Sequence, residues 1–144
     1  MKWKIEMSIK NRKASFDYFF IRELVAGIML KGTEVRSIKE GKASLVDSFC
    51  YFDKGELYVK GIDISEGKFF PHEAKRDRKL LLKKNELGKL EDDLVKGTSI
   101  IVKRIFFNER GKVKLEIALA RGKKEYDKRN SIKERELDRD MRSY

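Results

Sequence analysis

The chain has only one cysteine, one proline and one histidine among its 144 residues. The single cysteine, Cys50, excludes an internal disulfide and a multi-cysteine zinc site, and it is typical of a reducing compartment. The single histidine, His72, excludes a Ser-His-Asp triad and a histidine metal cluster built by one chain. The sequence also lacks a glycine-rich phosphate loop that precedes a lysine. We therefore expect no enzyme activity, no metal and no cofactor.

Long hydrophobic runs are missing as well. No apolar run approaches the ~20 residues of a membrane span. The N-terminal residues MKWKIEMSIK contain no hydrophobic core of a signal peptide. These features predict a cytoplasmic protein that does not bind membranes, and we expect it to be monomeric.

What the chain has in excess is positive charge. Its 35 Lys and Arg outnumber its 24 Asp and Glu, which gives a net charge of +11. An excess of this size on a small protein favours binding to phosphate backbones. Residues 121–144 carry nine Lys or Arg against six Asp or Glu, a net charge of +3, and residues 1–120 carry the remaining +8. Both parts of the chain are therefore candidates for RNA contact.

The length fits one folded domain, residues 1–120, followed by a tail, residues 121–144. In the domain, residues 16–30 are rich in aromatic and β-branched residues and predict one bent strand or two short ones. Thr33 is a suitable N-cap for a short helix that Gly41 would end, and Asn85 is a suitable N-cap for a second helix that ends at Gly97. Residues 65–79 read as a polar loop.

The remaining segments predict antiparallel strands. Residues 48–52 and 56–64 flank the turn Asp53-Lys54-Gly55, and residues 98–107 and 113–120 flank the turn Glu109-Arg110-Gly111. In the last strand Val113, Leu115, Ile117 and Leu119 alternate with Lys114, Glu116 and Ala118. Short strands at this spacing predict a mainly β protein, a small closed antiparallel barrel of OB-like Greek-key topology with two or three short helices.

The tail is too poor in aliphatic residues to form a core, so we expect it to be disordered when the protein is alone. On a helix, however, six of its cations fall in a stripe about 60° wide. They are Arg121, Lys124, Lys128, Arg135, Arg139 and Arg142. Two interpretations stay open: a solvated charged tail, or a segment that folds on nucleic acid.

Polar residues near the start of the domain are candidates for RNA binding. Asn11, Arg12 and Lys13 come directly before the first long predicted strand, where an amide and two cations can meet phosphates or loop bases. Glu34 can accept a hydrogen bond from a base amine or a 2′-hydroxyl, or it can serve only the first turn of its helix. Lys42, after Gly41, lies beside it.

Four blocks of the sequence resemble small protein B (SmpB), the bacterial family that binds transfer-messenger RNA. They are NRKA, AGIMLKGTEVRSIKEGKASLVDS, RDRKLLL and ARGKKEYDKR, and the resemblance runs from about Asn11 to the last residue. It implies an OB-like barrel that holds the tRNA-like domain of transfer-messenger RNA and carries it to stalled ribosomes. Translation then resumes on the RNA and appends a degradation tag. The partners implied are transfer-messenger RNA and the small-subunit ribosomal RNA.

The resemblance also assigns residues. Contacts with transfer-messenger RNA are implied for Asn11, Lys13, Glu34, Arg36 and Lys42. In the tail, which the family places as a helix in the decoding centre and the empty mRNA channel, the matching residues are Tyr126, Asp127, Lys128, Arg129, Lys133, Arg135 and Arg139. Tyr126 replaces the histidine of many members, and either ring can stack on a base. The loop from Ser65 to Ala74 is shorter than usual, so no contact is carried over from it.

The main alternative is another binding protein, an OB-like ribosomal protein or translation factor that stays on ribosomal RNA. A basic barrel with a basic tail fits that function equally well. An RNA-processing enzyme is the third possibility, and it would require metal-dependent cleavage.

Overall fold

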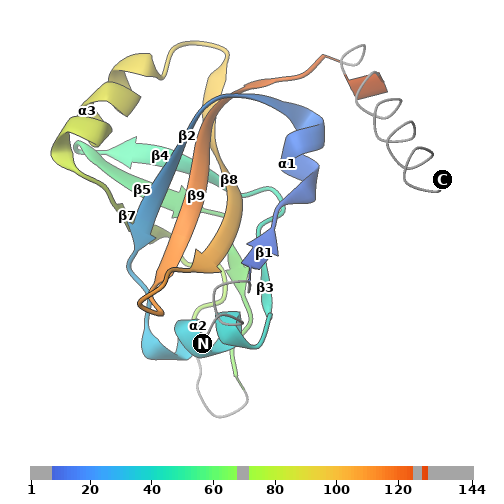
Figure 1. Ribbon diagram of the computed structural model, residues 1–144, viewed down its shortest axis with the longest axis vertical. Helices are drawn as coiled ribbons and strands as arrows, with labels where there is room; N and C mark the ends of the chain where they lie inside the picture. The colour runs from blue at the N-terminus through green and yellow to red at the C-terminus, as the bar shows by residue number, and fades with distance from the viewer. Residues whose placement is uncertain (1–7, 68–71, 125–127, 130–144) are drawn as a thin grey trace.

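The computed structural model describes residues 8–67, 72–124 and 128–129 (Figure 1). Strands account for most of its regular structure, as predicted. The strands are β1 (Ser8–Lys10), β2 (Tyr18–Ile28), β3 (Ala43–Ser44), β4 (Phe49–Asp53), β5 (Glu56–Lys60), β6 (Asp63–Ile64), β7 (Arg78–Leu81), β8 (Thr98–Phe107) and β9 (Val113–Gly122). The helices are α1 (Arg12–Asp17), α2 (Gly32–Lys39) and α3 (Lys84–Asp93).

The pairings of the main sheet run in a cycle. From β8 they pass through β4, β5, β7, β2 and β9, and β9 pairs with β8 again. All these pairs are antiparallel. The long strand β8 has β9 along one edge, while β4 and β1 share the other edge, β4 near Ile100 and β1 near Ile105. The short strands β3 and β6 form a separate ladder.

The alternation predicted for β9 is confirmed on its inner face. Leu115 and Ile117 are fully buried, and they pack in one core with residues of β2, β5 and β8 and with Ile38 and Leu90 from α2 and α3. Ala118, which alternation places on the outer face, is buried too. The reason is α1, which covers that part of the sheet with Ala14.

Helix α1 is the main element that the sequence did not predict. It includes Phe16 and Asp17, which the sequence pattern predicts as part of a strand, so β2 begins at Tyr18. From Tyr18 to Ile28 the expected strand forms with one β-bulge at Ile21, since the register with β9 shifts between Phe20 and Arg22, and Met29 and Leu30 lie beyond its end. A bulge bends a strand and increases its twist, which agrees with the bent strand predicted.

The helix N-caps predicted from side chains were wrong in both remaining helices. Lys31, not Thr33, is the N-cap of α2, and Lys83, not Asn85, is the N-cap of α3. In each helix the glutamate at the third position accepts from the N-cap backbone N–H, Glu34 at 2.8 Å and Glu86 at 3.1 Å. This contact is one half of a capping box. The glutamate satisfies the backbone N–H of the N-cap residue, although that residue is a lysine.

Both predicted hairpins formed, but Asp53 belongs to β4, and the expected strand 56–64 is split into β5 and β6. Lys54 and Gly55 have φ values of 52° and 79°, which both central residues of a two-residue type I′ turn require. In the second hairpin, Asn108 accepts from Gly111 and donates to Lys112 through the backbone, each at 2.9 Å. The polar loop ends at Asp77, because Arg78 and Lys79 belong to β7. At the other end of the domain, β9 extends two residues beyond Ala120, to Gly122.

Among the described residues, no helix is long and apolar enough to cross a membrane.

Candidate RNA interface

Asn11 fixes the start of α1 to the sheet. Its Oδ1 accepts from the backbone of Ala14 at 3.3 Å, as an N-cap does. Its Nδ2 donates to the carbonyls of Leu45 at 3.1 Å and Val102 at 2.9 Å. The oxygen and both N–H groups of the amide are thus in use, and the side chain of Asn11 holds α1 in place. An RNA partner would therefore meet the residues beside Asn11.

The cations beside Asn11 are exposed. Arg12 and Lys13 both point to solvent from the first turn of α1. Lys13 Nζ lies 3.3 Å from Asp47 Oδ1, and the two side chains are 55% and 79% exposed. An ion pair this exposed is worth well under ~1 kcal/mol, so a phosphate can replace Asp47 at small cost.

Arg36 and Lys42 form a second basic corner, at the end of α2. Both lie near the carboxylate of Glu40, Arg36 at 3.7 Å and Lys42 at 3.2 Å, and both side chains are more than 60% exposed. In Figure 1, α2 lies at the bottom of the molecule and α1 at the upper right. The structure thus separates the predicted contacts into two groups, Asn11 and Lys13 at α1, and Arg36 and Lys42 at α2.

Glu34 is not part of either exposed group. Its side chain is fully buried, and its two carboxylate oxygens accept from Arg76 and Arg78, with the shortest distance to each at 2.6 Å. The Nη atoms of Arg78 donate in turn to the carbonyls of Ile62 at 2.9 Å and Ala74 at 3.0 Å. Glu34 therefore ties the first turn of α2 to the end of the loop that precedes β7.

The charge state of Glu34 follows from these contacts. Burial raises the pKa of the carboxyl, but hydrogen bonds from Arg76, the Lys31 backbone and Arg78 outweigh it, so the pKa is lower than usual. The carboxylate is ionised at neutral pH and has no exposed surface for a base or a 2′-hydroxyl. From the sequence, Glu34 could accept from RNA or serve the first turn of its helix, and the structure displays the second role. Any role of Glu34 in RNA binding therefore acts through other residues.

The sequence did not identify Arg76 and Arg78 as partners of Glu34. The sequence predicts both within the polar loop of residues 65–79, yet Arg78 is fully buried and the side chain of Arg76 is only 24% exposed. A separation of 42 and 44 positions from Glu34 leaves no local pattern that would predict these pairs.

The start of the tail lies against α1. The backbone N–H of Lys123 donates to Asp17 O at 2.7 Å, and its Nζ donates to Ser15 O at 3.1 Å. Lys128 Nζ lies 3.5 Å from Asp17 Oδ1, and its N–H donates to Lys124 O at 3.1 Å. Residues 128–129 are helical, and Arg129 is exposed. The predicted tail contacts Tyr126, Asp127, Lys133, Arg135 and Arg139 lie outside the described residues.

The predicted helical stripe needs one correction. Arg121 and Gly122 belong to β9, where they pair with Phe19 and Tyr18 of β2. Arg121 lies 5.4 Å from the centre of the Phe19 ring, and Lys123 Nζ lies 4.9 Å from it. A helix cannot begin at a residue held in a sheet ladder, so Arg121 is not part of the stripe.

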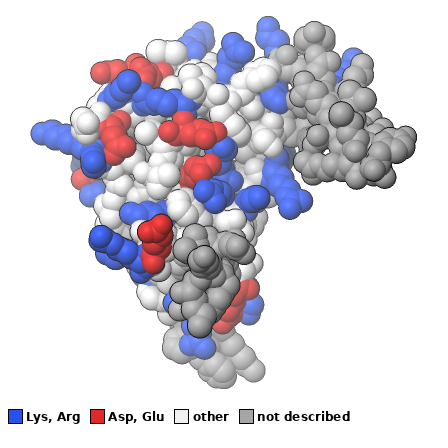
Figure 2. Space-filling model, in the orientation of Figure 1, with Lys and Arg blue, Asp and Glu red and all other residues white. Residues whose placement is uncertain are grey.

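The chemistry of these surfaces is that of anion binding. In the described part of the chain, no three His, Cys, Asp or Glu side chains are placed to hold a metal ion. His72 is buried between Thr33 Oγ1, 3.1 Å from Nδ1, and the carbonyl of Ile64, 2.9 Å from Nε2, so it joins the loop to α2. Figure 2 shows Lys and Arg spread over one face of the molecule, with acidic side chains between them. Exposed cations spread over a surface in this way are suited to bind a nucleic acid, whose phosphates lie at intervals along its backbone.

Comparison with known proteins agrees with binding to a nucleic acid. The family model described as SmpB protein matches residues 8–144. An SsrA-binding protein of Phocaeicola vulgatus is 54% identical over 139 residues, which cover 94% of this chain and 93% of the relative. One from Parabacteroides distasonis is 52% identical over 147 residues, covering 98% and 96%. One from the more distant Thermosipho melanesiensis is 45% identical over 141 residues, covering 93% and 94%.

A solved structure is similar as well. A chain described as "tmRNA-SmpB: a journey to the center of the bacterial ribosome" superposes with a TM-score of 0.71 at 38% identity, covering 88% of this chain and 94% of that one. The class defined by fold and surface is therefore that of a basic, mainly β nucleic-acid-binding protein. Within it, the chain belongs to the SmpB family.

Proposed function

We propose that this protein binds the tRNA-like domain of transfer-messenger RNA and delivers it to stalled ribosomes for trans-translation. The tagged nascent peptide is thereby marked for degradation. The observation that carries the proposal is membership of the SmpB family over residues 8–144, with relatives named as SsrA-binding proteins at about half identity. The similar solved chain comes from a tmRNA–SmpB structure of the bacterial ribosome. The function is binding rather than catalysis, and its place is the cytoplasm.

The two exposed basic corners support an RNA partner for the domain. Lys13 at α1 and Arg36 and Lys42 at α2 each lie near one carboxylate that is itself exposed. Phosphates bind such cations and release counterions, which supplies a large share of the affinity of a nucleic-acid interface. We assign Asn11 and Glu34 a positioning role, Asn11 for α1 and Glu34 for the start of α2.

We also propose that the domain is a closed barrel of OB-like Greek-key topology. The cyclic order of pairings from β8 round to β9 supports closure. Among the described strands, closure leaves only β1 and the small ladder of β3 and β6 outside the cycle, and it protects the long strands from edge-to-edge association.

The tail is proposed to occupy the decoding centre and the empty mRNA channel, with Tyr126, Asp127, Lys128 and Arg129 at the first and Lys133, Arg135 and Arg139 along the second. Lys128 supports this division. It touches Asp17 through one ion pair that is partly exposed, so ribosomal phosphates can compete for it. We place the proposed boundary between domain and tail after Lys124, because Lys123 is still bonded to α1.

The main alternative is a protein that stays on ribosomal RNA whether or not the ribosome is stalled. Sequencing the RNA that co-purifies with the native protein separates the two functions. We expect one structured RNA in excess over ribosomal RNA, and enrichment on ribosomes whose mRNA ends in the decoding centre. Recovery of ribosomal RNA alone, in equal amounts from translating and stalled ribosomes, would favour the alternative.

A further inference from the structure

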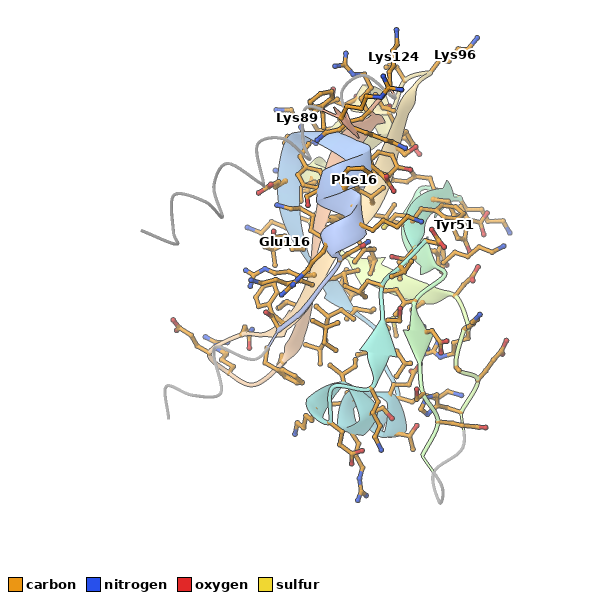
Figure 3. All side chains as sticks on the ribbon, turned by 90° about the vertical axis from the view of Figure 1, so that its right-hand side faces the viewer. Phe16, Tyr51, Lys89, Lys96, Glu116 and Lys124 are labelled. Carbon is orange, nitrogen blue, oxygen red and sulfur yellow. The ribbon has the colours of Figure 1, made fainter. Side chains whose placement is uncertain are left out.

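Two hollows flank α1, and they differ in charge. In Figure 3, α1 lies between Tyr51 on one side and Glu116 on the other. The hollow that includes Tyr51 has a volume of about 640 Å³ and is lined by Asp17 and Asp47 against a single lysine, Lys13. The hollow that includes Glu116 has a volume of about 260 Å³, and its other charged residues are all cations: Lys10, Arg12, Lys103 and Arg104. Only the smaller hollow has the charge that an anion requires.

A β-bulge brings two of these cations together. On β8, Val102 lies opposite Ile117 and Arg104 lies opposite Glu116, so Lys103 is an extra residue in the ladder. Neighbouring side chains of a regular strand point to opposite faces. The bulge removes this alternation, and Lys103 Nζ and Arg104 Nε both reach Glu116, at 3.2 and 3.1 Å. Bulges often re-aim side chains in this way next to functional sites.

The other two cations are held at the same place by backbone hydrogen bonds. Lys10 lies opposite Arg104 in the ladder between β1 and β8. The backbone N–H of Asn11 donates to the carbonyl of the bulge residue Lys103 at 2.7 Å, and its side chain donates to Val102 O. Arg12 follows directly as the first residue of α1. The ladder of β1 with β8 and the hydrogen bond from Asn11 N–H to Lys103 O thus fix the backbone around the hollow.

The cations of the hollow exceed the acids near it. Glu116 and Glu23 pair with Lys103, and Glu116 also pairs with Arg104. Lys10 and Arg12 make no ion pair with any described residue, and both are exposed. Burial raises the pKa of Glu116, but hydrogen bonds from Arg104 and Lys103 outweigh this and lower it, so the surplus is of two positive charges at neutral pH.

The hollow also has an apolar wall. Phe20 lines it, and Lys103 Nζ lies 4.7 Å from the centre of the Phe20 ring. A wall of this kind suits a ribose or a base edge better than it suits a fully hydrated inorganic ion. The small volume limits the occupant to one nucleotide, because a duplex would lie across the opening.

We propose that this hollow binds one unpaired nucleotide of RNA, its phosphodiester paired with Lys10 and Arg12 and its sugar or base against Phe20. Lys103 and Arg104, held in place by Glu116, complete the positive wall. The inference rests on the proposed function, since it adds a further RNA contact to the same binding domain. Lys10, Lys103 and Arg104 lie outside the family blocks and outside the two basic corners, whereas Arg12 belongs to the block NRKA and lies beside Lys13, with Asn11 as the shared positioning residue.

The test compares two double variants that lose the same charge. Lys10→Gln with Arg12→Gln empties the hollow of its unpaired cations without breaking an ion pair. Lys60→Gln with Lys89→Gln removes two exposed lysines of β5 and α3 as a control. Binding of the isolated tRNA-like domain is measured by filter retention over a salt series. We expect the first variant to bind roughly tenfold more weakly, with a log–log salt slope reduced by about 0.7 to 0.9, the share of one phosphate. The control should keep the wild-type slope.

A second measurement gives the location. A photo-crosslinking benzoylphenylalanine at Ser15, which lines the small hollow, should attach to the RNA, whereas the same probe at Tyr51, across α1, should not. Equal affinity and slope in the two double variants would overturn the inference. A slope change twice as large would show two separate phosphates and overturn the single-nucleotide site.

The proposed function fails in a different way. If the wild-type protein did not bind the tRNA-like domain but bound a single-stranded RNA oligonucleotide, the proposed function would be wrong. The same pair of variants would then test the hollow on the oligonucleotide, with the same slopes expected. If the wild-type protein bound neither RNA, both proposals would be wrong.

Discussion

The buried glutamate Glu34 gives the sharpest prediction for stability. Its carboxylate carries a full charge with no solvent exposure, and it is balanced by Arg76 and by the fully buried Arg78. Replacing Glu34 by glutamine keeps the size of the side chain but leaves two guanidinium groups without their counter-charge. Removing one partner of a buried ion pair costs about 3 to 5 kcal/mol. Glutamine still offers one acceptor, so we expect the lower end, about 3 kcal/mol, and a Tm lower by roughly 10 °C.

The pH dependence of this effect has a definite sign. The folded-state pKa of Glu34 is lower than that of a free glutamate, so the ion pair stabilises the protein above ~pH 4.3, the usual value for the unfolded chain. That stabilisation is lost as the pH falls through the lower folded-state pKa. The difference between wild type and Glu34→Gln should therefore be full at pH 7 and should shrink progressively below about pH 4.

Urea unfolding followed by circular dichroism measures both effects, and Glu40→Gln is the matched control. Glu40 is the C-cap residue of the same helix, its side chain is 47% exposed, and its partners Arg36 and Lys42 are exposed as well. Its replacement should cost no more than about 0.5 kcal/mol. A Glu34→Gln protein as stable as Glu40→Gln at pH 7 would refute the argument from burial, as would a loss of stability that stays the same at pH 3.

Three further predictions concern RNA and the ribosome. Truncation after Lys124 should leave a folded protein that binds transfer-messenger RNA but does not support tagging; a parallel loss of RNA binding in a folded truncation would contradict separate roles for domain and tail. Lys13→Ala should lower the salt slope of RNA binding by about 0.7 to 0.9, which a filter-binding titration detects, and an unchanged slope would exclude a phosphate contact. Ile132→Pro should impair tagging in a reconstituted translation assay while RNA binding stays intact, because proline costs ~3 kcal/mol inside a helix. Normal tagging would mean that the tail acts as an extended strand.

The strands of the two hairpins were predictable because their signals are local, whereas β1, β3 and β7 were not predicted. Residues 98–107 form β8 with the predicted bounds, and the hairpin around Lys54 and Gly55 follows from a turn that requires positive φ. Helix α1 was missed because its six residues carry too few apolar positions to show a helical period, and because it is stabilised by tertiary bonds from Asn11 to Leu45 and Val102. Tertiary contacts of this kind override weak local propensity.

The candidate site was only partly predictable, for a related reason. Lys13, Arg36 and Lys42 are exposed, as contacts with RNA must be. Glu34 belongs to the same block of sequence as Arg36, yet it is buried, and its partners come from residues more than 40 positions away. A family resemblance marks both positions as important. It does not tell a residue that contacts RNA from a residue that holds other residues in place.

The bulge at Lys103 shows why the arrangement of charge is not contained in its sequence. Two adjacent cations in a strand predict one side chain on each face, which would send either Lys103 or Arg104 toward the core. One extra residue in the ladder places both beside Glu116 instead. The carbonyl of the bulge residue Lys103 also accepts a hydrogen bond from Asn11 N–H, the residue that seats α1. The bulge therefore avoids a buried unpaired cation and at the same time positions the helix that carries Arg12 and Lys13, so that fold stability and the proposed RNA contacts depend on one local feature.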